Sequence, residues 1–276
     1  MRLQGKAGIV TGAAKGIGKA IASLFVQHGA RVVLVDVDAG ALERTAAELK
    51  GGPGEAVPFA GDLGRPEVAQ AVAALAMDRF GRLDFLVNNA AWYVVAPLVE
   101  TADEDWDETI RNALTSVFLM CKAVLPHMVR QGQGAIVNIA SINQIVANPH
   151  HAAYTAAKGG VRGLTKQIAI EYGPHGIRCN CISPGLIVTE RIRETLTPAD
   201  ERLIREAYPI GRLGRVDDVA YAALYLVSDE SGFVTGVDLP VDGGLTSLSP
   251  GALVSPALRR RWGRPPIRIA GEEAVE

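Results

Sequence analysis

The sequence predicts an α/β fold: a single domain built on a doubly wound sheet of seven parallel strands with helices on both faces. Short, almost continuously apolar runs rich in β-branched residues alternate with longer alanine-rich stretches of helical length. Parallel strands that are apolar on both sides must be covered on both faces, and the intervening helices provide that cover. A chain of 276 residues is long enough for one large domain, which buries about three quarters of its unfolded surface.

The seven strands are expected at the apolar runs. In chain order these are AGIV (7–10), RVVLVD (31–36), AVPFA (56–60), DFLVNN (84–89), GAIVNIA (134–140), GIRCNCIS (176–183) and VDLPVDG (237–243). Helices are expected over 19–29, 103–131 and 152–173. No repeat, linker or low-complexity tract divides the first part of the chain, so residues 1–246 are expected to form the single domain.

Composition narrows the class of partner. The chain has 28 Lys and Arg against 30 Asp and Glu, which gives no general attraction to nucleic acid or to anionic membranes. Its three cysteines have no metal-ligand spacing and cannot all pair, so we expect a reducing compartment and no metal. The N-terminus has no apolar stretch typical of a secretory signal, and no run is long enough to span a membrane. A cytoplasmic protein with a small-molecule partner is expected.

The composition changes near Ser247, and residues 247–276 form a C-terminal extension rich in proline and arginine. It carries four prolines and the closely spaced Arg259, Arg260, Arg261, Arg264 and Arg268. Such a tail is usually solvated or laid as an arm on a neighbouring subunit, and only rarely binds nucleic acid. Packing on a neighbouring subunit is the alternative that we favour.

A glycine-rich turn, TGAAKGIG, occupies residues 11–18 between the first strand and a helix. Gly12, Gly16 and Gly18 permit a tight turn and let a pyrophosphate approach the backbone N–H groups at the helix N-terminus. Asp36 ends the second strand, where a carboxylate can bind the ribose hydroxyls of a dinucleotide. Strand, turn, helix and acid together predict a Rossmann-type dinucleotide site.

The same acid predicts which dinucleotide binds. A carboxylate at Asp36 accepts hydrogen bonds from the adenosine ribose and repels a 2′-phosphate, which favours NAD over NADP. Lys15, inside the glycine turn, argues for NADP because a basic side chain there can contact a 2′-phosphate. Asp36 is given more weight, since its contact to the 2′ position is direct while Lys15 can extend into solvent.

From about Leu3 to Leu245 the chain resembles the short-chain dehydrogenase/reductase family. The motifs that carry the resemblance are TGAAKGIG (11–18), Asp62-Leu63, NNA (88–90), Asn112, Ser141, Tyr154 with Lys158, and PGLIVT (184–189). The resemblance implies a catalytic domain that transfers a hydride between an alcohol and nicotinamide. Two features depart from the family pattern: Ala91 replaces the glycine of the usual NNAG, and the extension follows the point where the family core usually ends.

Tyr154 and Lys158 are the expected catalytic pair. Residues four apart share one face of a helix, so both head groups can enter one pocket. A tyrosine hydroxyl has a reference pKa of about 10, and Lys158 together with the positive nicotinamide ring is expected to lower the pKa of Tyr154 by favouring the phenolate. Tyr154 is then the group that transfers the proton of the substrate hydroxyl.

The resemblance assigns roles to the other site residues. Lys158 is expected to hold the nicotinamide ribose, Ser141 to bind the reacting oxygen, and Asn112 to hold a water that links Lys158 to solvent. Further expected cofactor contacts are Ile17 in the glycine turn, Asp62 and Leu63 at the adenine, Asn89 and Ala90 at the ribose, Pro184 and Gly185 in the last turn, and Ile187 and Thr189 at the carboxamide. For Thr189 a role as helix N-cap is the alternative, because a helical stretch follows it.

The substrate pocket is expected beside the catalytic residues. The expected contacts are Trp92, Ser141, Asn143, Gln144, His151, Tyr154 and Leu186, with Tyr93, Asn148 and His150 nearby. Their amide and imidazole groups suit a sugar, sugar acid or polyol that is oxidised at a secondary or anomeric alcohol. Trp92 can stack on a sugar ring or, equally, on a steroid. The charged segment 189–214 is expected to act as a mobile lid, in which Arg191 and Arg193 are candidate partners for an anionic group.

Other functions stay open from the sequence. An NADPH-dependent reductase of 3-oxoacyl or other carbonyl compounds and a hydroxysteroid dehydrogenase use the same chemistry. A non-catalytic dinucleotide sensor would keep only the cofactor half, and a nucleic-acid binder would depend on the arginine tail and on salt. Because the family is usually tetrameric through its two long helices and its last strand, a homotetramer is expected.

Overall fold

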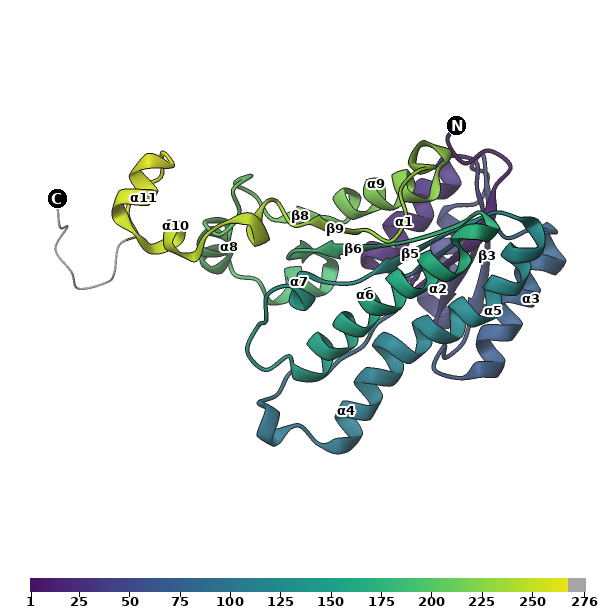
Figure 1. The fold of residues 1–276 in the computed structure, drawn as a ribbon, viewed down its shortest axis with the longest axis horizontal. Helices are drawn as coiled ribbons and strands as arrows, with labels where there is room; N and C mark the ends of the chain where they lie inside the picture. The colour runs from purple at the N-terminus through teal and green to yellow at the C-terminus, as the bar shows by residue number, and fades with distance from the viewer. Residues whose placement is uncertain (268–276) are drawn as a thin grey trace.

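A computed structural model of the chain describes residues 1–267 and confirms the predicted sheet (Figure 1). The seven strands are β1 (Ala7–Thr11), β2 (Arg31–Asp36), β3 (Glu55–Ala60), β4 (Phe85–Asn88), β5 (Gly134–Ile139), β6 (Ile177–Pro184) and β9 (Asp238–Val241). Every pair is parallel, and the strand order is β3-β2-β1-β4-β5-β6-β9. A second sheet, which the sequence did not suggest, joins β7 (Ile187–Val188) to β8 (Gly214–Arg215).

Helices connect the strands and continue into the extension. The α-helices are α1 (Gly16–Gln27), α2 (Ala39–Glu48), α3 (Pro66–Phe80), α4 (Asp103–Ile110), α5 (Ser116–Gln131), α6 (Ala152–Tyr172), α7 (Glu190–Thr195), α8 (Pro198–Arg205), α9 (Val216–Val227), α10 (Pro250–Val254) and α11 (Pro256–Arg261). Short 3-10 turns are η1 (Leu98–Glu100), η3 (Ile142–Gln144), η4 (Gly173–His175), η5 (Asp229–Ser231) and η6 (Leu245–Ser247).

Successive residues of the strands pack on opposite faces of the sheet. In β2, Val33 and Val35 join the core formed with α3, α5 and α6, whereas Val32 and Leu34 join the core formed with α1 and α9. This alternation explains why the strands are apolar at almost every position. The three cysteines are buried and unpaired.

The helix expected over 103–131 is continuous but contains a π-helical segment. Between α4 and α5, η2 (Arg111–Thr115) adopts the wider π geometry, and Asn112 lies in it. Such segments are rare and often mark functional sites. The stretch Asp103–Gln131 is long and apolar enough to cross a membrane by length and composition, but it begins with three acidic residues and packs on the sheet through α5. We therefore assign it to the core layer.

The described part of the C-terminal extension is folded. In Figure 1, α10 and α11 lie near α8, at the end of the molecule opposite the N-terminus. Arg259 is only 2% exposed, and Arg259 and Arg264 both form ion pairs with Glu206 of the same chain. Residues 247–267 are thus attached to the segment 189–214 of the same chain through two arginines. Packing on a neighbour stays a prediction, and Arg268 lies outside the described residues.

Candidate active site

The glycine turn is packed too closely for larger residues at two positions. A Cβ atom on Gly18 would lie 2.0 Å from the carbonyl oxygen of Gly12, and one on Gly12 would lie 2.7 Å from Asn89 Nδ2. Gly12 and Gly16 also have positive φ angles of 63° and 58°, which favour glycine. The sequence therefore needs glycine here to bring β1, α1 and the loop after β4 together.

A cavity of ≈360 Å³ opens beside this turn, at the carboxyl ends of β1 to β4. Residues expected to bind the cofactor line it: Gly12, Lys15, Asp36, Asp62, Leu63, Asn89 and Ala90. The other lining residues are Val37, Asp38, Gly61, Gly64, Ala91, Trp92, Asn112, Ser116 and Arg191. Crevices at this edge of a doubly wound sheet hold dinucleotides, and the glycine turn, the start of α1 and the acid at the rim fit the phosphates and ribose of one.

Asp36 presents a fixed carboxylate to this cavity. Its Oδ2 accepts a hydrogen bond from the N–H of Ala14 at 3.1 Å, and its Oδ1 accepts one from the N–H of Asp38 at 3.1 Å. Asp38 adds a second acid at the rim and caps α2 through the N–H of Ala41. Lys15 is exposed. Asp36, Asp38 and Lys15 therefore all line this part of the cavity.

The Asp62 carboxylate forms an ion pair with Arg111 of the π-helical segment η2. Its Oδ2 accepts a hydrogen bond from Arg111 Nη1 at 2.7 Å, and its Oδ1 accepts one from the N–H of Gly64 at 2.9 Å. Burial alone would raise the pKa of Asp62, but these two donors and the charge of Arg111 lower it overall. Asp62 is therefore a fixed anion at the cavity wall, and its contact with adenine stays a prediction.

Asn89 lines the cavity while its amide holds two loops together. Nδ2 donates to the carbonyl oxygens of Thr11 at 3.0 Å and of Gly12 at 3.2 Å. Thr11 Oγ1, in turn, accepts hydrogen bonds from the N–H groups of Asn89 at 2.9 Å and of Ala90 at 3.0 Å. The sequence analysis missed Thr11 as a site residue, although it begins the glycine motif.

Ser141, Tyr154 and Lys158 are brought together at the ends of β5 and α6. Lys158 is 2% exposed and donates from Nζ to the carbonyl oxygen of Ile139 at 2.7 Å. The same Nζ lies 5.6 Å from the centre of the Tyr154 ring. Ser141 Oγ accepts a hydrogen bond from the N–H of Asn143 at 3.1 Å, which leaves its own hydrogen free to be donated.

Burial shifts the pKa values of this pair in opposite directions. Burial raises the pKa of Tyr154 to about 12, the hydrogen bond with Ser141 lowers it by less, and the nearby phenol of Tyr93 raises it further. Burial lowers the pKa of Lys158 to about 8. Lys158 donates to Ile139 in this structure, and the expectation that Lys158 and the nicotinamide ring together lower the pKa of Tyr154 stays a prediction.

Asn112 is placed by the π segment and makes local contacts. Its side-chain Nδ2 donates to the backbone carbonyl oxygen of Glu108 at 2.8 Å. Its backbone carbonyl oxygen accepts a hydrogen bond from Ser116 Oγ at 2.7 Å. Asn112 and Ser116 both line the cofactor cavity. The water relay from Asn112 to Lys158 stays a prediction.

An aromatic cluster flanks Tyr154. The rings of Tyr93 and Tyr154 have centroids 4.1 Å apart, and His151 lies 5.7 Å from Tyr93 and 6.2 Å from Tyr154. The Arg191 guanidinium stands 5.9 Å from the centre of the Tyr93 ring. Trp92 is 42% exposed on the same loop. The surroundings of the reacting phenol are therefore more aromatic than the sequence analysis expected.

Two side chains expected to contact the substrate form hydrogen bonds with other residues of the protein. Asn143 is 6% exposed, and its Oδ1 accepts a hydrogen bond from Asn148 Nδ2 at 3.0 Å. Gln144 Nε2 donates to Ser183 Oγ at 3.0 Å and also to the Asp238 carboxylate. The amide nitrogen of Gln144 thus joins η3 to β6 and β9, and Asn143 keeps only part of its hydrogen-bonding capacity, so substrate contact by either residue stays a prediction.

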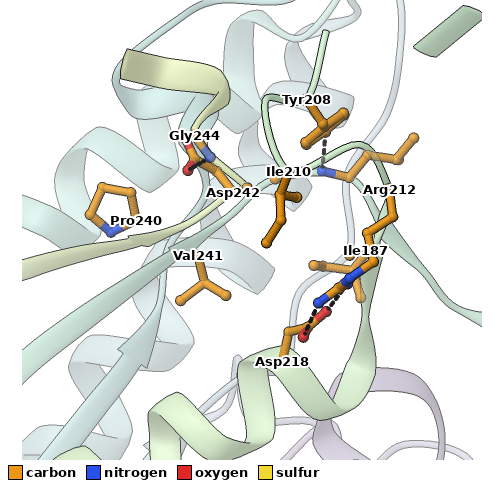
Figure 2. A pocket seen from close by; sticks show the side chains of 13 residues that line it. Ile187, Tyr208, Ile210, Arg212, Asp218, Pro240, Val241, Asp242 and Gly244 are labelled. Carbon is orange, nitrogen blue, oxygen red and sulfur yellow. Dashed lines mark hydrogen bonds and ion pairs between the residues drawn. The ribbon is translucent and has the colours of Figure 1, made fainter. Parts of the chain in front are cut away.

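The last loop is joined to the lid by a residue that the sequence analysis missed. Tyr208 is 3% exposed, and its hydroxyl oxygen accepts a hydrogen bond from the N–H of Leu186 at 2.8 Å. A Cβ atom on Gly185 would lie 3.2 Å from the same hydroxyl oxygen. Figure 2 shows this contact at a cavity of ≈270 Å³, where the Arg212 and Asp218 pair lies on another wall. The signal in the sequence was only one tyrosine within the charged segment.

The two expectations for Thr189 are compatible. Its hydroxyl accepts a hydrogen bond from the N–H of Ile192 at 3.4 Å, so Thr189 caps α7. A Cβ atom built on Gly16 would lie 3.3 Å from the Thr189 methyl group. The first residue of the lid therefore packs against the glycine turn. The N-cap role is thus confirmed, and contact with the carboxamide stays a prediction, as it does for Ile187, which is buried.

A buried polar chain behind the site was also missed. Asn88 Nδ2 donates to Asn138 Oδ1 at 2.8 Å, and Asn138 Nδ2 donates to Thr165 Oγ1 at 2.9 Å. Thr165 Oγ1 donates to the carbonyl oxygen of Val161 at 2.8 Å. These bonds join β4, β5 and α6 and so fix the helix that carries Tyr154 and Lys158 against the sheet.

Comparisons with known proteins agree with this geometry. A family model described as "Enoyl-(Acyl carrier protein) reductase" matches residues 12–246. The chain is 42% identical over 245 residues to D-threitol dehydrogenase of Mycolicibacterium smegmatis, covering 89% of this chain and 94% of that protein. It is 40% identical over 245 residues to a 3-oxoacyl-(acyl-carrier-protein) reductase of Thermotoga maritima, covering 89% and 99%.

A solved structure has the same fold. The crystal structure of levodione reductase superposes with a TM-score of 0.86 at 30% identity, covering 90% of this chain and 100% of that chain. The matched length, the parallel sheet and the assembled serine, tyrosine and lysine lead to one conclusion. The chain belongs to the short-chain dehydrogenase/reductase family, and it is an oxidoreductase that acts on alcohols or ketones with a nicotinamide cofactor.

Proposed function

We propose that the protein is an NAD-dependent dehydrogenase that oxidises a secondary or anomeric alcohol of a small polyol, sugar or sugar acid. The observation that carries the choice of cofactor is the Asp36 carboxylate, whose two oxygens are held by backbone N–H groups at the rim of the cavity. A 2′-phosphate placed there meets two like charges, Asp36 and Asp38, in a partly desolvated setting. NADP binding is therefore weakened relative to NAD.

The residues of the chain supply the proton chemistry. A bound nicotinamide accepts or donates the hydride, and the protein must move the proton of the substrate oxygen. Tyr154 is the transfer group: with a pKa of about 12 it is protonated at neutral pH and ready to donate to a carbonyl oxygen. In alcohol oxidation Tyr154 must first lose that proton to solvent, through Lys158 and the water expected at Asn112, and Ser141, which favours the phenolate, supports this step. With a substrate bound, the Ser141 hydroxyl donates its one hydrogen to the substrate oxygen instead and so orients it.

A small hydroxylated substrate is supported by the relative from M. smegmatis, whose name is D-threitol dehydrogenase. Within this chain, His151 and the rings of Tyr93 and Tyr154 form a surface that suits the C–H face of a sugar or polyol. The exposed ring of Trp92 extends this surface. Few amide groups stay free for hydroxyls, so we propose a substrate that is small and is recognised at one end.

The main alternative is an NADPH-dependent reductase of 3-oxoacyl or other carbonyl compounds. The relative from T. maritima and Lys15 favour it, and Asp36 opposes it. A hydroxysteroid dehydrogenase is supported only by the aromatic surface around Tyr93. A non-catalytic dinucleotide sensor is not supported, because a pure binder needs neither the buried Lys158 nor the phenol beside it.

The proposal is tested by measuring reduced-cofactor absorbance with a panel of polyols, sugars, sugar acids, steroid alcohols and 3-oxoacyl thioesters, each with NAD(H) and NADP(H). We expect the highest kcat/KM for a polyol or sugar with NAD. Asp36→Ala is expected to narrow the preference for NAD over NADP by about tenfold or more, since it removes the repulsive charge. Faster 3-oxoacyl reduction with NADPH than any oxidation with NAD would contradict the proposal.

We also propose a cytoplasmic homotetramer. A groove of ≈510 Å³ between α5 and α6 is lined by Phe118, Leu125, Pro126, Leu164, Ile168 and Tyr172 among others. Phe118 is 46% exposed in the single chain. Apolar surface of this kind on the two long helices suits a two-fold contact with a second copy.

A further inference from the structure

The C-terminal extension, defined here over its described residues 247–267 and called the strap, is attached to the lid by two arginines. Arg259 donates to Glu206 Oε2 at 2.8 Å, to the carbonyl oxygen of Leu253 at 3.1 Å and to that of Pro265 at 2.6 Å. Its guanidinium is thus both a clip within the strap and a buried ion pair with the lid. Burying a charge in this way is costly unless all its hydrogen bonds are made.

Arg264 reaches the same part of the lid from the other end of the strap. It donates to the carbonyl oxygen of Glu206 at 2.7 Å and to that of Tyr208 at 2.9 Å. Its guanidinium also stacks over the Trp262 ring at 3.9 Å, which restricts its orientation. The two arginines together lower the pKa of Glu206, through the hydrogen bond with Arg259 first. The carboxylate of Glu206 is therefore held as an anion between them.

The strap reaches the active site through Tyr208. Arg264 holds the backbone of Tyr208, whose hydroxyl oxygen accepts the N–H of Leu186 at 2.8 Å. Leu186 follows the turn at Pro184 and Gly185, and its carbonyl oxygen accepts the N–H of Gly214 at 3.0 Å, at the other end of the lid. A continuous path of contacts thus runs from the strap to the turn beside the expected nicotinamide and substrate site.

We propose that Arg259 and Arg264 are positioning residues, through which the strap fixes the lid and lets Tyr208 hold the Pro184–Leu186 turn in its substrate-binding position. The family model ends at residue 246, so this device is an addition of this chain to the matched domain. The strap acts on substrate binding rather than on hydride transfer, because its path of contacts leads to the Pro184–Leu186 turn and does not include Tyr154. The expected change in KM rests on the proposed dehydrogenase activity.

The first test needs no substrate. Hydrogen exchange is measured on the full chain and on Arg264→Ala, Tyr208→Phe and Arg260→Ala. We expect the Leu186 amide to exchange at least about tenfold faster in Arg264→Ala and in Tyr208→Phe, since its hydrogen bond is weakened or lost. Arg260→Ala, a matched change at an exposed arginine of α11 within the strap, should keep the wild-type rate. Unchanged Leu186 exchange in Arg264→Ala with an intact β1 would overturn the proposal.

Hydrogen exchange at the amides of β1 distinguishes loss of the fold from loss of the strap contact. If Arg264→Ala speeds exchange there as well, Glu206→Gln decides instead, because it keeps the side-chain shape and removes only the charge that both arginines share. Faster exchange confined to residues 186–210 in Glu206→Gln supports the proposal, and exchange equal to the wild type overturns it. Because no turnover is involved, a wrong substrate assignment cannot produce either result.

The second test is kinetic and uses the best substrate of the panel. Arg264→Ala is expected to raise the substrate KM about tenfold while kcat changes less than about twofold, because uniform binding is lost. On a Tyr208→Phe background the same change should have little further effect, since both act through one hydrogen bond. The path through Tyr208 would be overturned if Arg264→Ala changed the substrate KM equally with and without Tyr208→Phe. A fall in kcat alone would also overturn it.

Discussion

At the scale of single residues, the site depends on two buried groups whose neutral forms are favoured. Tyr154 has its pKa raised to about 12 and Lys158 has its pKa lowered to about 8, in both cases chiefly by burial. A buried tyrosine and lysine in one cleft are a common sign of catalysis, because such shifts are costly for stability. Their roles can be tested separately.

Tyr154→Phe removes the proton-transfer group and little else. We expect kcat to fall about 100- to 10,000-fold, the usual range for loss of a general acid or base, while NAD affinity stays nearly unchanged. Steady-state kinetics and cofactor fluorescence titration measure the two quantities. Tyr172→Phe, at the far end of α6, is the control and should keep full activity. Appreciable turnover by Tyr154→Phe would contradict the assigned role.

Lys158→Met tests the cost of the buried ammonium through pH. Between about pH 8 and the ordinary lysine pKa of 10.5, the unfolded chain binds more protons than the folded chain at this position. The free energy of unfolding of the wild type should therefore rise with pH across this window, relative to Lys158→Met, by at most about 3 kcal/mol. Urea titrations of both proteins at several pH values measure the difference. A difference that is flat from pH 8 to 10.5 would show that the charge is not disfavoured in the fold.

At the scale of elements, the glycine turn and α1 form a unit that tolerates no added side chain. Gly18→Ala would place a methyl group 2.0 Å from the carbonyl oxygen of Gly12, so the turn must move. We expect the Kd for NAD to rise at least about tenfold, equivalent to about 1.4 kcal/mol. Calorimetric titration measures the Kd. Gly40→Ala in α2 is the matched control, because its Cβ atom meets nothing closer than 3.5 Å, and NAD binding equal in both variants would contradict this account.

Most elements could be predicted because their sequence signals are local. The apolar runs mark all seven strands of the main sheet to within about two residues, since period and composition reflect burial on both faces. The π segment at Asn112 could not be predicted, because one wide turn leaves the helical pattern of 103–131 unchanged. The residues of the glycine turn could be assigned from spacing alone, as their role depends on the backbone.

Some polar side chains make contacts that the sequence does not reveal, because their partners are distant in the chain. Gln144 is expected at the substrate, and its amide also meets Asp238, 94 positions later in the chain. Tyr208 was missed because its partner, the N–H of Leu186, is a backbone group that no motif reveals. Directions of polar side chains are set by tertiary contacts, and a single sequence does not show them.

At the scale of the whole molecule, the groove between α5 and α6 is the surface that we propose for assembly. Phe118→Glu places a charge in this apolar groove and is expected to reduce the molecular mass in solution from that of a tetramer, because a buried unpaired charge opposes association. Sedimentation velocity measures the mass. Val99→Glu, at a residue that is 93% exposed outside the groove, should leave the tetramer intact. A tetramer that survives Phe118→Glu would place the interface elsewhere.

The position of the strap in the chain also has a consequence for synthesis. Strands β1 to β6 can pair with one another before β9 leaves the ribosome, because β9 adds only to the open edge beside β6. Glu206 and Tyr208 gain their partners Arg259 and Arg264 only after β9 has been translated. The lid of a nascent molecule is therefore anchored later than its sheet, so a chain that ends early at residue 246 carries all seven strands with an unanchored lid.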